Sequence, residues 1–240
     1  MKKISIIILV AFTLITSCSK NGTSNTEKSA APSATAVSQA DAEKKYELEA
    51  QHQMDEEFKN PKQPVVKDTD NFKGNKNAPI TIVTYSDFEC SFCSRAHGIV
   101  EELLKKYDGK IRYTFKNLPL TSIHPYAMIS AQYFEAITLQ DKELAWKFHD
   151  TVFENQEILN EQGEAYVKSV AKNLGVDMNK LEEDVKSDAV KNKIKEDSAE
   201  AIKFGFRGTP AFLVNGVSLM GAQPVEEFSK IIDRHLSGKK

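Results

Sequence analysis

The stretch SDFECSFCSRAH, residues 86–97, contains two cysteines separated by two residues and lies between two segments of different periodicity. The β-branched run ITIVTYS, residues 80–86, precedes the pair and predicts a buried strand. From Cys90 to about Tyr107 the apolar residues recur with helical spacing, and KIRYTFKNL then predicts a second strand. The stretch therefore predicts a β-α-β unit whose helix begins at a Cys-x-x-Cys pair.

Three interpretations of this pair are open: a redox pair, half of a metal site, or coincidence. A disulfide between Cys90 and Cys93 would close a loop of four residues, which is too short to stabilise a fold through loop entropy. A closed zinc site normally takes four protein ligands, yet the chain has no second Cys-x-x-Cys, and its five histidines show no paired spacing. A redox pair is favoured, and we expect neither a metal nor a cofactor.

The length and the charge of the chain exclude some classes of protein. With 240 residues, it can form one compact domain with appendages. It has 32 Lys and Arg against 34 Asp and Glu, a net charge of −2, so no large basic surface is available for a nucleic-acid backbone. We therefore expect no nucleic-acid partner.

The N-terminus has the pattern of an export signal. Lys2 and Lys3 precede a short apolar stretch, residues 4–15, which is typical of a signal peptide rather than a membrane span. The sequence Ile-Thr-Ser-Cys that ends at Cys18 resembles the lipobox of bacterial lipoproteins. This resemblance implies that Cys18 is lipidated and anchors the chain to a membrane. The alternative is an ordinary signal peptide followed by a stray cysteine.

The segments before the β-α-β unit are less informative. Residues 18–42 are rich in Ser, Ala and Thr, which predicts a disordered tether. Residues 43–59 favour a helix with a thin apolar stripe. This helix could be a stalk, a dimerisation helix, a flap on the main domain or simply a solvated arm. Residues 60–79 carry Pro, Gly, Asn and Lys and predict a linker or loop.

After the second predicted strand, the pattern becomes helical and then returns to β structure. Helices are predicted over four ranges, the last with Asp177 as its N-cap: 126–139, 141–154, 163–174 and about 178–204. Asn215-Gly216 between two apolar runs then indicates a type I′ hairpin. A final helix has Pro224 in its first turn.

Three local motifs together resemble the DsbA-like branch of the thioredoxin superfamily: YSDFECSFC, KNLPLTSIHPYAMISA and GTPAFLVNG, within about residues 76–237. The resemblance implies an α/β fold, a thioredoxin fold with an inserted helical subdomain. It also implies a thiol-disulfide oxidoreductase that acts outside the cytoplasm, with a cis-proline loop at Thr209-Pro210 beside the cysteines. The chain departs from the best-known DsbA pattern, because Ser91-Phe92 rather than Pro-His separates the cysteines.

The physical chemistry of the motif assigns roles to its residues. A helix N-terminus stabilises an anion, so Cys90 is predicted to be the low-pKa attacking thiol. Cys93, one turn further along, is predicted to be the resolving thiol. Ser91 and Phe92 tune the redox equilibrium or merely cap and pack. The backbone at Pro210 would meet substrate peptide, and the Thr209 hydroxyl would touch the sulfurs. His97 is expected to be a solvated helix residue.

These observations divide the chain into a signal peptide (1–17), a tether (18–42), a helix with its linker (43–75) and a main domain (76–240). The main domain has a helical insertion at about 125–205. The predicted function is the formation or exchange of disulfides in exported proteins, in the bacterial cell envelope, with an unidentified redox partner. A homodimer through residues 43–59 remains open. The alternatives are a disulfide reductase or isomerase, and a non-catalytic lipoprotein binding module with a thioredoxin fold.

Overall fold

The computed structural model describes residues 39–67 and 70–238. The predicted signal peptide and the lipidation at Cys18 lie outside these residues, as does the predicted tether up to residue 38. The chain divides into two compact units, residues 1–42 and 43–240. Residues 39–42, expected to be part of the tether, are helical. The description that follows concerns the second unit.

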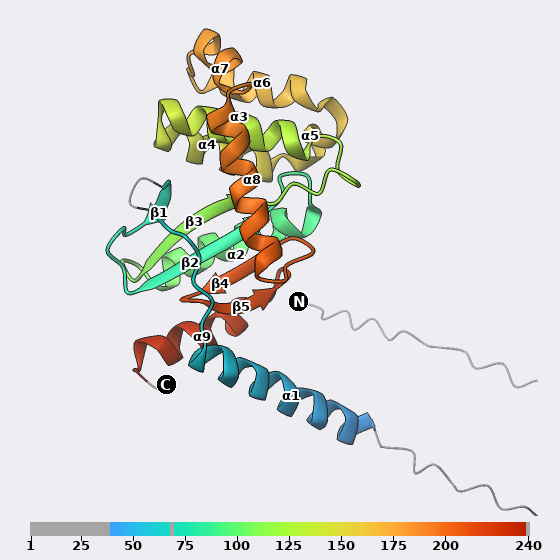
Figure 1. Ribbon diagram of the computed structural model, residues 1–240, viewed down its shortest axis with the longest axis vertical. Coiled ribbons are helices and arrows are strands. Elements are labelled where there is room, and N and C mark those ends of the chain that lie inside the picture. The colour runs from blue at the N-terminus through green and yellow to red at the C-terminus, as the bar shows by residue number, and fades with distance from the viewer. Residues whose placement is uncertain (1–38, 68–69, 239–240) are drawn as a thin grey trace, which may run out of the picture. The chain divides into compact units, whose positions relative to one another are not determined.

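A five-stranded sheet forms the centre of this unit (Figure 1). Its strands are β1 Phe72–Gly74, β2 Ile80–Ser86, β3 Ile111–Asn117, β4 Ala211–Val214 and β5 Val217–Met220. The order across the sheet is β1-β3-β2-β4-β5. Strands β2 and β3 are parallel, and the other neighbouring pairs are antiparallel. The predicted β-α-β unit therefore occupies the middle of the sheet.

Strand β1 corrects the prediction of a linker over residues 60–79. It pairs antiparallel with β3, with Phe72 opposite Thr114, and so belongs to the folded sheet although it precedes the expected domain start at residue 76. Its three residues, FKG, are too few to show the alternation that identifies a strand in a sequence. The folded sheet thus begins earlier in the chain than predicted.

Helices cover the sheet and form the insertion between β3 and β4. Their bounds are α1 Gln39–Lys59, α2 Ser91–Lys106, α3 Ala127–Gln140, α4 Lys142–Glu154, α5 Gln156–Gln162, α6 Glu164–Asn173, α7 Met178–Asp184, α8 Asp188–Lys203 and α9 Val225–Leu236. Helices α3 to α8 form the expected insertion. Across residues 39–67 and 70–238, none of the helices combines the length and the apolar character needed to cross a membrane.

Two features of the insertion differ from the prediction. The helix expected over 178–204 is divided into α7 and α8, because Ser187 caps a new helix by accepting a hydrogen bond from the Val190 amide. Asp177 caps α7 as predicted, through the amides of Asn179 and Lys180. Helix α5, which was not predicted, follows α4 after one residue. Two polar caps thus replace one long helix by two shorter ones.

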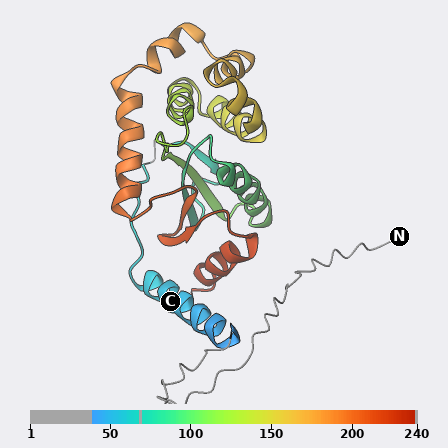
Figure 2. The same ribbon diagram turned by 90° about the vertical axis from the view of Figure 1, so that its right-hand side faces the viewer.

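Both faces of the sheet are buried. Successive side chains of β2 point to opposite faces, so this one strand contributes to two buried clusters. Ile80 and Ile82 belong to a large core with α2, α9 and the insertion, whereas Val83 and Tyr85 belong to a smaller cluster with the end of α8. Figure 2 shows α8 on one side of the sheet, and α2 and α9 on the other. Helix α2 begins shortly after β2 ends, so its first turn lies at the carboxyl end of the parallel strands β2 and β3.

The last turns of α1 pack against the main domain. Asp55 pairs with Arg234 of α9 at 2.5 Å, and the Arg234 guanidinium stacks over Phe58 at 3.9 Å from the ring centre. Earlier in the helix, Tyr46 and Leu48 are exposed. The C-terminal part of the helix predicted over residues 43–59 is therefore docked on the main domain. Dimerisation through this helix remains a prediction.

Candidate active site

Cys90 is the N-cap residue of α2, directly after the turn that follows β2. Its backbone is extended, with φ −76° and ψ 119°, and its carbonyl accepts the first helical hydrogen bonds, from the amides of Cys93 at 2.9 Å and Ser94 at 3.2 Å. The first amides of the helix therefore remain free to stabilise a negative charge on the Cys90 sulfur. This is the placement that the sequence predicted.

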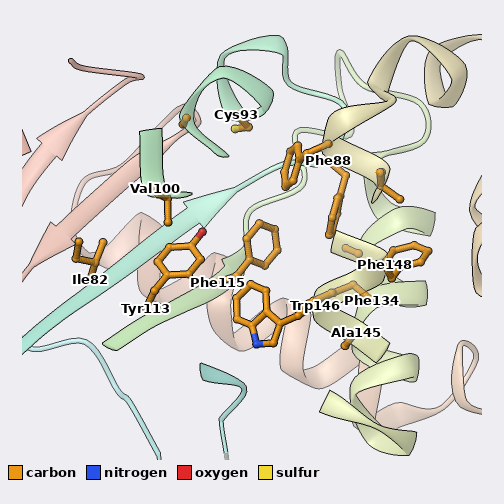
Figure 3. Close-up of a cluster of buried hydrophobic side chains, with 14 of the residues drawn as sticks. Ile82, Phe88, Cys93, Val100, Tyr113, Phe115, Phe134, Ala145, Trp146 and Phe148 are labelled. Carbon is orange, nitrogen blue, oxygen red and sulfur yellow. The ribbon is translucent and has the colours of Figure 1, made fainter. Parts of the chain in front are cut away.

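Both cysteines are free thiols and both are buried. Cys90 retains 6% of its exposure, whereas Cys93, one turn into the helix, retains 2%. Figure 3 shows Cys93 beside the buried apolar cluster that includes Phe88, Val100 and Tyr113. The two sulfurs thus differ in access, and Cys90 is the one nearer to solvent.

The pair has opposite proton affinities. A hydrogen bond from the Cys93 thiol lowers the pKa of Cys90 to about 5, although burial opposes the shift, and the Thr209 side chain and the amides of Cys93 and Phe92 add to it. Burial, together with the hydrogen bond to Cys90, raises the pKa of Cys93 well above its ordinary value. At neutral pH, Cys90 is therefore a thiolate and Cys93 a thiol that donates to it.

The loop before β4 meets the cysteines from another part of the chain. The Thr209-Pro210 peptide bond is cis, as the resemblance implied. The Sγ of Cys90 lies 3.4 Å from the carbonyl oxygen of Thr209. The loop is held in place because Ala211 pairs with Tyr85 of β2, and because the Gly221 amide donates to the Pro210 carbonyl at 2.8 Å. The fold thus brings together four of the predicted site residues.

The two intervening residues face outward. Phe92 is 53% exposed, and the guanidinium of Arg95 lies 5.1 Å from the centre of its ring. Ser91 is also exposed. The Phe92 amide contributes to lowering the pKa of Cys90, whereas its side chain is largely exposed. A tuning role for Ser91 and Phe92 remains a prediction.

Two carboxylates, of which Asp87 was not predicted, hold the turn before Cys90. The buried carboxylate of Asp87 accepts hydrogen bonds at 2.8 Å from the amides of Glu89 and Leu120, and it contacts His124 Nδ1 at the same distance. Burial raises the pKa of Glu89, whose carboxylate accepts from the Tyr126 amide at 2.6 Å. Asp87 and Glu89 therefore tie the cysteine turn to the loop after β3.

Gln156 of α5 is a second support that the sequence did not reveal. Its buried side-chain amide donates to the carbonyls of Phe88 at 2.8 Å and Cys90 at 3.0 Å. Gln156 lies 66 residues after Cys90, and α5 itself was not predicted, so no local pattern connects the two. The insertion thereby contacts the active-site turn directly.

His97 corrects another expectation, because its side chain is 10% exposed rather than solvated. It lies on α2 beside His149 and Asp150 of α4, with donor atoms within 4.8 Å of one another. The Lys73 ammonium already bonds Asp150 at 2.8 Å, and His149 Nδ1 lies 2.9 Å from the other carboxylate oxygen. Both carboxylate oxygens of Asp150 thus already have partners, and we assign no cation to this group.

The geometry supports two-electron sulfur chemistry. A thiolate that retains slight exposure lies beside a protonated thiol on the same helix turn, and the Thr209 carbonyl lies within contact distance of its sulfur. The thiolate is the nucleophilic form of cysteine, and the neighbouring thiol can complete an exchange. The two sulfurs can hold the two electrons themselves, without another group.

Comparison with known proteins identifies relatives of this architecture. Residues 66–234 match the family model described as "Thioredoxin". Among solved structures, BdbD from Bacillus subtilis superposes with a TM-score of 0.64 at 21% identity, covering 74% of this chain and 98% of that one. A thioredoxin-like oxidoreductase from Silicibacter pomeroyi DSS-3 has a TM-score of 0.62 at 24% identity, covering 71% and 94%. The thiol-disulfide exchange protein alpha-DsbA2 from Wolbachia pipientis has a TM-score of 0.62 at 19% identity, covering 79% and 97%. At these identities, the structural similarity establishes the DsbA-like fold.

Curated relatives include much longer proteins. The chain is 34% identical over 177 residues to Na(+)/H(+) antiporter NhaA 1 from Salinispora arenicola, covering 74% of this chain and 26% of that protein. It is 30% identical to Na(+)/H(+) antiporter NhaA from Herminiimonas arsenicoxydans, covering 74% and 27%. The chain thus spans about a quarter of the length of these relatives, and their name describes proteins of which it matches one part.

Proposed function

The chain belongs to the thioredoxin family, and from this premise we propose that it is a thiol-disulfide oxidoreductase that forms or exchanges disulfides in exported proteins through Cys90 and Cys93. The observation that carries the proposal is the opposite protonation of two adjacent buried sulfurs at the start of α2. A purely structural dithiol has no need of a low-pKa sulfur at a helix N-terminus. The facing Thr209 carbonyl adds a backbone group at the position where substrate chain would lie.

In the oxidising direction, the cycle begins with a disulfide between Cys90 and Cys93. A substrate thiolate attacks the Cys90 sulfur, so that a mixed disulfide forms and Cys93 leaves as a thiolate that takes up a proton. A second substrate thiolate then attacks the substrate sulfur of the mixed disulfide and releases Cys90 as a thiolate. The substrate gains a disulfide, and the protein gains two electrons, which a separate redox partner must remove.

In the reducing direction, the same bonds change in reverse order. The Cys90 thiolate attacks a substrate disulfide and releases one substrate sulfur, and Cys93 then attacks Cys90 to release the other. The depressed pKa of Cys90 favours the oxidising direction, because stabilising the thiolate stabilises the reduced protein. Reductase or isomerase activity is therefore the second candidate, distinguished by the redox potential.

We place this activity in the bacterial cell envelope. The apolar N-terminal stretch and the lipobox-like residues before Cys18 support export and a lipid anchor. Lipoprotein modification adds more than one acyl chain, and two chains suffice for stable anchoring. The partners would then be exported proteins with thiols or disulfides, together with a redox protein that recycles the pair.

The decisive experiment follows electron transfer by the purified protein. Oxidised protein, mixed with a reduced unfolded protein that has two cysteines, should form a substrate disulfide while the Cys90–Cys93 pair becomes reduced. Cys90→Ser should abolish the reaction, and Cys93→Ser should accumulate the mixed disulfide. If the wild type leaves the substrate reduced and also fails to reduce insulin, the chain is a binding module rather than an oxidoreductase.

A further inference from the structure

A small polar cavity lies on the buried side of Cys93. Its volume is about 10 Å³, which is room for about one water molecule. Side chains from several elements around Cys93 line it, among them Thr84 of β2, His97 of α2, Tyr113 of β3 and His149 of α4. The resolving thiol, which has little exposure of its own, therefore adjoins a small cavity lined in part by two histidines.

His149 has a defined orientation and tautomer in this pocket. Its Nδ1 lies 2.9 Å from Asp150 Oδ1. Although burial opposes the shift, hydrogen bonds from His149 and Lys73 lower the pKa of Asp150 to about 2, so this carboxylate is ionised and accepts. The proton of the neutral ring must then be on Nδ1. This leaves Nε2, which is buried and has no hydrogen-bond partner among the described residues, as a free acceptor.

We propose that His149, oriented by Asp150, accepts the proton of Cys93 across this cavity when Cys93 resolves the mixed disulfide. This inference rests on the proposed function. As the Cys93 sulfur attacks the Cys90 sulfur, the Cys93 proton passes to His149 Nε2, either directly or through one water. The bond between Cys90 and the substrate sulfur breaks, and the substrate leaves as a thiolate. The imidazolium then returns its proton to solvent.

The chemistry of the step requires such an acceptor. Burial raises the pKa of Cys93 well above its ordinary value, so the thiol does not ionise unaided at neutral pH. Once Cys90 is part of a mixed disulfide, it is no longer the thiolate to which Cys93 donates. Burial lowers the pKa of His149 to about 4, so its ring is neutral across the ordinary pH range and the lone pair of Nε2 is not already occupied by a proton.

The other groups around the cavity are less suitable acceptors. Burial raises the pKa of Tyr113, so its hydroxyl stays protonated. His97 has its Nδ1 3.9 Å from Asp150 Oδ1, beyond hydrogen-bond distance, so nothing selects its tautomer. The charged groups that act on His149 are Asp150 on its own helix and Lys73 of β1, and Lys73 also pairs with Glu101 of α2 at 2.6 Å. Lys73 holds Asp150 at 2.8 Å and so supports the positioning residue.

The test separates the two chemical steps in one trace. Reduced protein reacts with an aromatic disulfide such as DTNB in two phases. Cys90 attacks first and releases one coloured thiolate, and Cys93 then resolves the mixed disulfide and releases the second. The released aromatic thiolate needs no proton, so the second phase reports on the deprotonation of Cys93. His149→Gln should slow the second phase about a hundredfold, within the range for general base catalysis, and leave the first phase unchanged.

The pH profile distinguishes a proton acceptor from a packing role. In the wild type, the second phase should change little between about pH 5 and 8, whereas in His149→Gln it should fall about tenfold for each unit of decrease, because hydroxide must replace the base. Asp150→Asn, which lies nearer the surface, should give a smaller version of the same profile. His97→Gln is the matched control and should behave as the wild type does.

The possible outcomes identify which idea fails. An equal slowing of the second phase of His149→Gln at every pH would reduce His149 to a packing role and overturn the inference. The inference would also be overturned if the second phase of His149→Gln and of Asp150→Asn kept the pH profile of the wild type. The same holds if only His97→Gln showed the hydroxide-dependent profile. If the wild type itself releases no second thiolate, the proposed function fails instead.

Discussion

The Sγ of Cys90 lies 3.4 Å from the carbonyl oxygen of Thr209, but this carbonyl is not among the groups that lower the pKa of Cys90. A carbonyl can accept from a thiol but offers nothing to a thiolate. The Cys93 thiol and the amides at the start of α2 favour the thiolate instead. Loss of the proton therefore frees the Thr209 carbonyl, which can then accept a hydrogen bond from a substrate amide.

The first prediction concerns this balance. Because the Cys93 hydrogen bond is the largest cause of the low pKa of Cys90, Cys93→Ala should raise that pKa from about 5 toward its ordinary value of 9.0. Cys93→Ser, which keeps a hydroxyl donor, should raise it less. The rate of alkylation of the single remaining cysteine against pH measures the change. An unchanged pKa in Cys93→Ala would assign the effect to the helix amides alone.

The same shift makes the stability of the reduced protein depend on pH. A pKa that is lower in the folded state than in the unfolded state contributes stability that is present above the unfolded value and lost as the pH falls. Between pH 5 and 9, the free energy of unfolding of the reduced protein, relative to Cys90→Ser, should therefore increase with pH by up to about 1.4 kcal/mol per unit. Urea unfolding of both proteins at several pH values measures this slope, and a flat difference would contradict the low pKa.

The second prediction concerns Gln156. Gln156→Leu removes the donor to the carbonyls of Phe88 and Cys90. Since a buried group left without its partner costs about 1–3 kcal/mol, the free energy of unfolding should fall by that amount. Gln162→Leu at an exposed position of the same helix is the control and should change it by less than about 0.5 kcal/mol. Equal effects of the two substitutions would indicate loss of helix α5 rather than of this contact.

The third prediction concerns a buried carboxyl group in the insertion. Burial raises the pKa of Glu135 to about 7, and Asn117 donates to it at 2.6 Å. A carboxyl with a raised pKa contributes stability that is present below its unfolded value of 4.5 and lost as the pH rises toward 7. Glu135→Gln should therefore gain up to about 3 kcal/mol relative to the wild type between pH 4 and pH 8. Thermal unfolding at both values measures the gain, and Glu161→Gln, at an exposed position, should show none.

The contrast between α2 and Gln156 shows how far the sequence could be interpreted. Strand β2 and helix α2 carry complete periodic patterns, so the position of Cys90 at a helix start followed from local spacing alone. Gln156 and His149 reach the cysteines from the insertion, more than 50 residues away, and nothing in a local pattern records such a contact. One missed signal was local: Ser187 followed by Asp188 is a helix start that divides α7 from α8.

The fourth prediction concerns Cys18, which lies outside the described residues. The lipobox-like sequence that ends at this cysteine predicts a lipid-modified mature N-terminus. Labelling of cells with a palmitate analogue should mark the wild type and leave Cys18→Ala unmarked. The variant should also leave the membrane fraction. Equal labelling of the two proteins would show that the export signal is an ordinary one.

The last prediction concerns the redox potential, which decides between oxidase and reductase. The low pKa of Cys90 stabilises the reduced form and makes the disulfide oxidising. Phe92, however, offers its ring to Arg95 and solvent, whereas a histidine at this position would add a donor and a positive charge within the same helix turn as the thiolate. We therefore expect a potential between those of thioredoxin and DsbA, about −270 and −120 mV. Phe92→His should shift it in the oxidising direction, and more at pH 6 than at pH 8, because the imidazolium forms below about pH 6.5.

Phe92→Ala removes the ring without adding a donor and should leave the potential unchanged. Equilibration with glutathione mixtures, followed by trapping of the two thiols, measures all three proteins. A wild-type potential as low as that of thioredoxin would favour the reductase. An equal shift in both variants would mean that exposure of the sulfur, rather than a positive charge at position 92, sets the potential.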